Sequence, residues 1–427
     1  MLYFVSIGLL GLLSLSIPVG IVLFLLGLGV DQFFSSFPLV RGLGSMVWST
    51  SDNAALIAIP FFVLLGEILV RSGIAERTYT ALDRWVSWLP GGLIHANIAT
   101  STMFSATSGS SVATAATVAT VAMPQAKALD YDPRMFSGAI AAGGTLGIMI
   151  PPSINLIVYG FLTQTSIPQL FLAGLLPGIG LALLFVAMTA VICTISPRLG
   201  GPRRTFPLAH MVSGLLDLIP IIILFSAIIG SIYKGWATPT EAASVGVGGA
   251  LAIGTLFGGI NWTIIRESLI GTVKITSMIM LVVIGASFLN FTLSSSGISQ
   301  ELRSFLDGLG FSPLTTIMVI VVMYIVLGFF IETLSLMVIT IPIIVPIVVG
   351  LGYDPIWFGI LMIVLIEMAL ITPPVGLNLY VVQSARGEGS LGEVMAGAFP
   401  YVIGMLVMVA ALIAFPKIAL YLPGAVQ

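Results

Sequence analysis

Two apolar segments of this chain each contain an adjacent pair of prolines, Pro151-Pro152 and Pro373-Pro374. A proline lacks a backbone N–H and clashes with the preceding helical turn, so neither segment continues as one straight helix. The carbonyl groups freed by such a break cannot face lipid, and they are tolerated where they line a polar cavity or bind an ion. The proline pairs therefore predict two broken helices, each interrupted for a functional reason.

The proline pairs belong to an internal duplication. Positions 151 and 373 are 222 residues apart, and the same spacing separates Tyr131-Asp132-Pro133 from Tyr353-Asp354-Pro355. A shared register over several motifs indicates a duplicated unit. We predict a single integral membrane transporter over residues 1–427. Its predicted parts are a first repeat (1–163), two connecting helices (164–236), a second repeat (237–386) and a C-terminal helix (387–427).

The composition places this duplicated unit in a membrane. Of the 427 residues, 58% are hydrophobic and 7% are charged, and the mean hydropathy is +1.15, whereas soluble domains carry about 25% charged residues. The chain is therefore predicted to be an all-α polytopic membrane protein, and its net charge of −2 gives no reason to expect a nucleic-acid partner. At about 20 residues per crossing, the apolar segments are 3–29, 53–70, 92–125, 134–163, 169–195, 213–233, 237–258, 275–293, 314–350, 356–385 and 398–422.

The basic residues predict the topology. If 92–125 and 314–350 are re-entrant hairpins, five crossings precede the second repeat, which is then inverted relative to the first. Cytoplasmic loops carry the excess of Lys and Arg, and this count gathers most of the basic residues on the side of the N-terminus. We therefore predict a cytoplasmic N-terminus that begins a retained first helix at 3–29. The residues on that side are Arg71, Arg77, Arg84, Lys127, Arg134, Arg198, Arg203, Arg204, Arg266, Lys274 and Arg386.

Inverted repeats with broken helices are the architecture of secondary transporters, whose sites lie where the discontinuous helices meet. The half-helix that begins at Pro152-Ser153 would direct the positive end of its dipole at an anion. The carbonyls of residues 144–149 would face a cation. The segment Ile371–Asn378 repeats this arrangement in the second half.

The first hairpin has the complementary polar groups. Residues 104–120, FSATSGSSVATAATVAT, are mostly Ser, Thr, Ala and Gly, which supply hydroxyls and also permit close helix packing. Hard cations prefer oxygen ligands of this kind, so both a cation site and a plain helix interface are open interpretations. Glu332 in the second hairpin stands 222 residues after Ser110.

Four motifs along the chain resemble those of a known family. The chain looks like the large membrane subunit of the tripartite ATP-independent periplasmic (TRAP) transporters, in its unfused form. In chain order, the motifs are SATSGSSVATAA, AAGGTLGIMIPPSINLIVYG, KGWATPTEAASVGV and ALITPPVGLNLYV. The resemblance covers essentially the whole chain. It implies an elevator-type, inverted-repeat fold with two re-entrant hairpins, in the bacterial inner membrane.

The resemblance also implies a function and partners. A periplasmic substrate-binding protein would deliver an organic acid, of the sialic acid or C4-dicarboxylate type, and a Na⁺ gradient would drive uptake. A small four-helix membrane subunit would complete the transporter in the lipid bilayer. Na⁺ is the expected coupling ion, and no cofactor is expected.

Carried over by motif, the residues expected at the cation sites come from both hairpins and both broken helices, and those expected at the substrate follow the proline pairs. The cation residues are Ser108, Gly109, Ser110, Ser111, Gly144, Thr145, Gly147, Glu332, Thr333, Thr372, Pro373 and Gly376. The substrate residues are Pro152, Ser153, Asn155 and Asn378.

Other polar residues of the membrane segments have a structural role as the simpler interpretation. Glu67 is expected to pair with Arg71, and Glu241 to cap a helix. Glu367 lies six residues before Pro373 and could pair with a helix end, bind a proton or orient a cation ligand, and the sequence does not decide between these roles. The competing functions are a stand-alone sodium/anion symporter of related fold, an intramembrane hydrolase and a pore. Against the hydrolase, TSGSS is not Gly-x-Ser-x-Gly and no His has a plausible role as a base beside it, so an enzyme is not expected.

Overall fold

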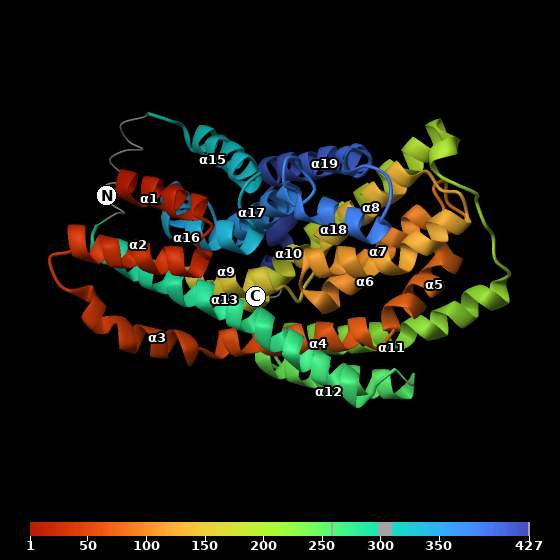
Figure 1. Ribbon diagram of the computed structural model, residues 1–427, viewed down its shortest axis with the longest axis horizontal. Coiled ribbons are helices and arrows are strands. Elements are labelled where there is room, and N and C mark those ends of the chain that lie inside the picture. Colours follow the sequence, from red (N-terminus) through yellow and green to blue (C-terminus); the bar gives the residue numbers. More distant parts are fainter. Residues whose placement is uncertain (258, 298–309, 426–427) are drawn as a thin grey trace.

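The computed structural model describes residues 1–257, 259–297 and 310–425. The described residues form helices and no strands, which confirms the all-α prediction (Figure 1). The first half contains α1 (Leu2–Ser14), α2 (Val19–Phe34), η1 (Leu39–Gly42), α3 (Leu43–Ser51), α4 (Ala54–Arg71), α5 (Ile74–Val86), α6 (Leu93–Ser108), α7 (Ser111–Ala128), α8 (Pro133–Met149), α9 (Ile154–Thr163) and α10 (Ile167–Ile195). It is followed by η2 (Pro197–Leu199), α11 (Leu208–Tyr233), α12 (Pro239–Leu256), α13 (Trp262–Ser295), α15 (Pro313–Gly328), α16 (Thr333–Gly350), α17 (Pro355–Ala369), α18 (Leu377–Arg386), α19 (Leu391–Ala414) and α20 (Lys417–Ala425).

The predicted hairpins and broken helices are present. α6 and α7 form the first hairpin, and α15 and α16 form the second. α8 and α9 are separated by residues 150–153 and bend by 41°, and α17 and α18 are separated by residues 370–376. Both Pro-Pro peptide bonds are cis.

The repeated Tyr-Asp-Pro motif starts the two broken helices. Asp132 accepts hydrogen bonds from the backbone N–H groups of Arg134 (2.9 Å) and Met135 (3.1 Å), and Pro133 is the first residue of α8. Asp354 caps α17 in the same way, ahead of Pro355. An Asp cap followed by Pro satisfies or removes the N–H groups that a helix start leaves unpaired, which explains why the motif occurs in both halves.

The two halves interlock through their first helices. α2 packs along α13, where a Cβ at Gly20 would lie 2.8 Å from the Leu281 side chain. In the same way α12 packs along α4, where a Cβ at Gly246 would lie 3.3 Å from Leu65. Each packed pair therefore contains one helix from each half.

The N-terminal segment differs from its prediction as one crossing. α1 and α2 run antiparallel, because Phe4 contacts both Gly29 and Phe33 while Gly8 lies against Leu26. The turn between them includes Ser16 with a φ of 57° and Pro18 as the cap of α2. A hairpin returns to the end where it began, so Met1 lies at the end of the molecule where α2 finishes (Figure 1).

Met1 is therefore remote from the end that holds most of the basic residues. We call that end, with Arg71, Lys127, Arg204 and Arg386, the basic end; α5 and the segment joining α10 to α11 lie there, on the right of Figure 1. The prediction of a single helix over 3–29 was wrong, because the chain turns back at residues 15–18. The segment 398–422 is likewise two helices, α19 and α20, interrupted at Phe415-Pro416.

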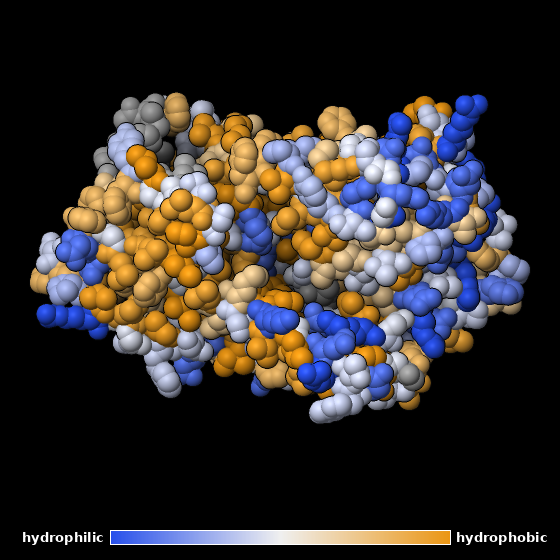
Figure 2. Space-filling model, in the orientation of Figure 1, coloured by the Kyte–Doolittle hydropathy of each residue, from blue (hydrophilic) through white to orange (hydrophobic). Residues whose placement is uncertain are grey.

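The exterior is apolar over much of its surface. Figure 2 shows a broad hydrophobic area over the part of the molecule around α1, α2 and α13, with hydrophilic residues gathered toward the basic end. Six helices among the described residues are long and apolar enough to span a membrane, and the bent pair α8–α9 makes a seventh. Exposed Leu183, Ile223 and Val273 lie on three of these helices. The chain is therefore a polytopic membrane protein.

An amphipathic helix lies at the basic end. In α5, Asp83 accepts two hydrogen bonds from Arg204, at 2.7 and 2.8 Å, which attaches this helix to the segment before α11. The amphipathic pattern of residues 76–92 predicts a helix that lies in the membrane interface. A similar pattern at 299–310 lies almost entirely outside the described residues.

Candidate functional site

The turn of the first hairpin depends on residues with special local roles. Gly109 has a φ of 57°, which residues other than glycine rarely adopt. Ser110 then caps α7 by accepting a hydrogen bond from the backbone N–H of Ala113 (3.4 Å). The hairpin turn therefore presents polar backbone and hydroxyl groups to the helices around it. The side chain of Ser108, also predicted here, lies outside the described part of the chain.

This turn meets the break in the first broken helix. A Cβ at Gly109 would lie 3.2 Å from Ile154, the first residue of α9. Ser153 caps α9 by accepting a hydrogen bond from the N–H of Leu156 (3.3 Å), and Pro152 is buried beside it. The predicted anion end of α9 is thus covered by the first hairpin. Asn155 is also buried there, and its Nδ2 has no hydrogen-bond partner among the described residues.

Two glycines bring α8 against the start of α7. A Cβ at Gly147 would lie 3.1 Å from the carbonyl oxygen of Ser110, and one at Gly144 would lie 3.0 Å from that of Ser111. Residues three apart share a helix face, so both glycines face the hairpin. Thr145 lies on a different face, where its hydroxyl donates to the carbonyl of Ala142 (2.6 Å). The structure brings Gly144 and Gly147 to the predicted site but turns Thr145 away from it.

Two residues of the second half reach the same place. The hydroxyl of Ser111 donates a hydrogen bond to Oε2 of Glu367, which lies in the last turn of α17. Asn378, at the start of α18, donates from Nδ2 to the carbonyl of Ala141 (3.1 Å). The same Nδ2 would lie 3.0 Å from a Cβ at Gly144. The first hairpin is therefore contacted by broken helices of both halves.

These two residues leave oxygen atoms without partners. Glu367 is 1% exposed and Asn378 is 0% exposed, yet Oε1 of Glu367 and Oδ1 of Asn378 accept no hydrogen bond from any described residue. Buried polar atoms without a partner are uncommon and call for an explanation. Oxygen atoms of carboxylate and amide groups fit a hard cation such as Na⁺. The unpartnered oxygen atoms of Glu367 and Asn378 are therefore of the kind that would bind the predicted cation.

The second hairpin has a different arrangement. Glu332 caps α16, where it accepts hydrogen bonds from Leu334 N (3.0 Å), from Ser335 N (2.9 Å) and from Ser335 Oγ (2.8 Å). Thr333 also donates to it, at 3.2 Å. The carboxylate that was predicted as a cation ligand is therefore already well supplied with donors, as expected for an acid at a helix start.

A cavity of about 160 Å³ connects the second hairpin to the second broken helix. Glu332 and Thr333 line it from one side, and Gly376, with a φ of 51°, lines it from the other. Thr372 donates its hydroxyl to the carbonyl of Met368 (2.6 Å) in its own helix, and Pro373 is exposed. The structure thus brings Glu332, Thr333 and Gly376 together and leaves Thr372 and Pro373 outside the cavity lining.

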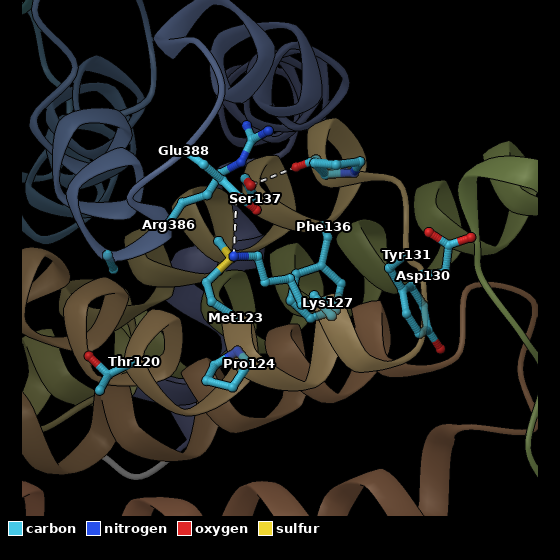
Figure 3. Close-up of a pocket in the computed structure, with 13 residues that line it drawn as sticks. Thr120, Met123, Pro124, Lys127, Asp130, Tyr131, Phe136, Ser137, Arg386 and Glu388 are labelled. Carbon is cyan, nitrogen blue, oxygen red and sulfur yellow. Dashed lines mark hydrogen bonds and ion pairs between the residues drawn. The ribbon is translucent and has the colours of Figure 1, made fainter.

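A larger cavity, of about 530 Å³, lies at the basic end between α7, α8 and the end of α18. Figure 3 shows Lys127 extending toward Glu388 across this cavity, and the two form an ion pair of 3.0 Å. Arg386, also in the lining, pairs with Glu393 of α19. Each of the two basic residues is paired with an acidic one, so the cavity has no excess of positive charge from them.

Most of these residues are predictable from the sequence, but their contacts are not. The sequence leaves the role of Glu367 in the second broken helix open and predicts Asn378 at the substrate. The contact of Glu367 with Ser111 in the first hairpin and that of Asn378 with Ala141 in α8 join residues 256 and 237 positions apart, which no local pattern reveals. Glu67 and Arg71 do pair, at 2.8 Å, and Glu241 forms a capping box with Thr238, as predicted.

Comparisons with known families agree with this architecture. A family described as "Tripartite ATP-independent periplasmic transporter, DctM component" matches residues 6–418. The C4-dicarboxylate TRAP transporter large permease protein DctM of Pseudomonas aeruginosa is 34% identical, with 90% of each chain covered. The sialic acid TRAP transporter large permease protein SiaM of Vibrio cholerae is 32% identical, with 97% of each covered. The 2,3-diketo-L-gulonate TRAP transporter large permease protein YiaN of Escherichia coli is 30% identical, with 96% of each covered.

A solved structure has the same fold. The YdaH transporter of Alcanivorax borkumensis matches with a TM-score of 0.66 at 15% sequence identity, covering 95% of this chain and 98% of that one. At this identity the likeness concerns the fold. It agrees with an arrangement of helical hairpins and broken helices in one chain.

Proposed function

Because the chain belongs to the DctM component family of the tripartite ATP-independent periplasmic (TRAP) transporters, we propose that it takes up an organic acid by Na⁺-coupled secondary transport. The named relatives handle C4-dicarboxylates, sialic acid and 2,3-diketo-L-gulonate, and all of these carry a carboxyl group. A carboxylic acid of the C4-dicarboxylate or sialic acid type is therefore the proposed substrate class. Members of this family are transporters rather than enzymes.

The observation that carries the proposal is the meeting of each hairpin turn with a broken helix. Gly109 contacts Ile154 in the first half, and Glu332 shares a cavity with Gly376 in the second. Helix starts and unwound backbone supply sites for anions and cations at the same depth of the membrane. Two such meetings provide the paired sites that coupled transport requires.

The polar groups divide between the two solutes. The unpartnered Nδ2 of Asn155 is a donor beside the start of α9, which suits a carboxylate. Asn378 lies beside Gly144 through its Nδ2, and its unpartnered Oδ1 is an acceptor, which suits Na⁺. We therefore keep Asn155, with Pro152 and Ser153, for the substrate and assign Asn378 to the cation.

An elevator movement follows from the division of the helices. The two hairpins and the two broken helices would form the moving transport domain. The fixed scaffold would consist of two packed helix pairs, α2 with α13 and α4 with α12. Filling of the cation sites would hold the hairpin turns against α8 and the residue 370–376 link. The transport domain would then slide with both solutes, and α5 would be the arm that joins it to the scaffold.

The orientation follows from the basic end. Because Lys and Arg are enriched in cytoplasmic loops, we place the basic end in the cytoplasm of a bacterial inner membrane. Met1, which lies at the opposite end, is then periplasmic. A small four-helix membrane subunit and a periplasmic substrate-binding protein are the proposed partners, in accordance with the family.

The test is uptake of labelled succinate and labelled sialic acid into proteoliposomes that contain this chain and its small subunit. The binding protein, an inward Na⁺ gradient, or both are omitted in parallel samples, and choline replaces Na⁺ at equal ionic strength. We expect uptake only when the binding protein and the gradient are both present. Uptake that needs Na⁺ but is indifferent to the binding protein would favour the stand-alone symporter, and uptake without Na⁺ would refute sodium coupling.

A further inference from the structure

Glu367 is the only charged residue of α17. Every residue of that helix from Trp357 to Ala369 is buried, and the carboxyl group lies within a helix that belongs to the membrane region. Within the described ranges no Lys or Arg forms an ion pair with it. A buried carboxylate without a compensating positive charge is very costly, so an ionised Glu367 requires a cation that is not part of the chain.

A purely structural role of Glu367 accounts for only one of its two carboxyl oxygen atoms. Oε2 accepts the hydrogen bond from Ser111 in the first turn of α7, where a negative charge complements the helix dipole. Ser110 already caps this helix through the N–H of Ala113. Oε1 remains without a partner among the described residues, so the capping role leaves one buried oxygen unexplained.

The internal repeat shows that this acid distinguishes the two halves. The position 222 residues earlier is Thr145, which turns away from the first hairpin and bonds within its own helix. The first half therefore has no acid at this position, while the second half supplies its acid to the hairpin of the first. Asn378 of the neighbouring helix α18, which packs against α7, lies beside Gly144 through its Nδ2, and its Oδ1 has no partner among the described residues.

From this geometry we infer that Glu367 is a ligand of the coupling cation at the first hairpin, binding through Oε1 while Oε2 holds Ser111. The inference rests on the proposed sodium-coupled function and deepens it. The carboxylate supplies the charge that neutral hydroxyl, amide and carbonyl oxygens lack. It also makes the first hairpin site depend on a residue of the second repeat.

The experiment measures Na⁺ binding without transport. The purified chain with its small subunit is titrated with NaCl, with choline chloride keeping ionic strength constant, and thermal unfolding is followed at each concentration. A ligand that binds the folded state stabilises it by RT ln(1 + [Na⁺]/Kd), so the unfolding temperature begins to rise once the Na⁺ concentration exceeds Kd. Glu367→Gln keeps the size of the side chain and an acceptor for Ser111 but removes the charge. Tyr401→Phe, which removes a buried hydroxyl bonded to Thr189, is the matched control.

We expect Glu367→Gln to raise the Na⁺ concentration at which the unfolding temperature begins to rise by at least about tenfold, the cost of disturbing a metal site, and Tyr401→Phe to leave that concentration unchanged. Glu367→Asp, which keeps the charge on a shorter side chain, should give an intermediate value. If Glu367→Gln titrates like the wild type, the residue is only a partner of Ser111 and the inference is wrong. If the wild type itself shows no response to Na⁺ in titration or uptake, sodium coupling fails and the inference fails with it.

Discussion

Gly138 of α8 lies directly against Gly397 of α19. A Cβ at Gly138 would fall 1.9 Å from the carbonyl carbon of Gly397, and a Cβ at Gly397 would fall 1.8 Å from the carbonyl oxygen of Arg134. Small residues at membrane helix interfaces allow this backbone contact. α8 carries Gly144 and Gly147 further along, so the same contact sets the position of the candidate cation site.

Gly397→Ala is expected to prevent this packing. The obstructing atoms belong to the backbone, which cannot move aside as a side chain can, and overpacking of this kind costs about 1–3 kcal/mol or more. Thermal unfolding of the purified protein should show a lower midpoint, or little folded protein should be recovered. Gly248→Ala, on α12 with open space around it, is the control, and equal stability of the two variants would contradict the described contact.

Ser110→Leu is expected to abolish Na⁺-dependent uptake while folded protein remains in the membrane. The substitution removes a helix cap, worth about 1 kcal/mol, and places a bulky apolar side chain at a turn that lies against Gly147. Ser110→Thr keeps the hydroxyl and the cap, so it should retain measurable uptake. Normal sodium-dependent uptake by Ser110→Leu would remove this turn from the site.

Arg204→Ala should destabilise the attachment of α5. The guanidinium contacts both carboxylate oxygens of Asp83, and the Asp83 side chain is 9% exposed, so its removal leaves a nearly buried carboxylate without its cation. Hydrogen bonds to charged groups contribute about 1.5–3 kcal/mol, and a loss of this size should appear in the unfolding midpoint. Adding Asp83→Asn should recover part of the loss. A double variant as unstable as the sum of the single ones would show that the pair is not coupled.

Lys127→Ala should have a much smaller effect. Its partner is Glu388, and the two side chains are 67% and 55% exposed, so water and salt screen the interaction. Exposed pairs contribute about 0–1 kcal/mol. The unfolding midpoint of Lys127→Ala should lie close to that of the wild type. A loss as large as that of Arg204→Ala would show that the ion pair at this cavity is stronger than its exposure indicates.

The features that the sequence predicted correctly depend on local chemistry. Pro151-Pro152 interrupts a helix wherever it occurs, and Asp132 followed by Pro133 starts one, so the broken helices and their repeat were evident before the structure. The apolar run from residue 3 to 29 was misread because its hydropathy is continuous, although Ser16 and Pro18 mark the turn. The mean hydropathy of an apolar window does not reveal a turn of only four residues within it.

The contacts at the site were beyond sequence analysis for a different reason. Thr145 and Gly147 are neighbours in one motif, yet the helical rotation between them sends only Gly147 toward the hairpin. Glu367 meets Ser111 because the two repeats interlock, and this depends on the packing of the whole molecule. Motif resemblance identified segments that the structure brings together, while the contacts between their residues required the three-dimensional arrangement.

The hairpin of α1 and α2 also has a consequence for linking this chain to another. A four-helix subunit crosses the membrane an even number of times, so both of its termini lie on one side. With the basic end in the cytoplasm, as proposed, and the termini of the small subunit on the same side, joining its C-terminus to Met1 would require one further membrane-spanning helix in the linker, because Met1 lies at the end opposite the basic residues. A single-chain version built with a short soluble linker would force one of the two partners to insert upside down.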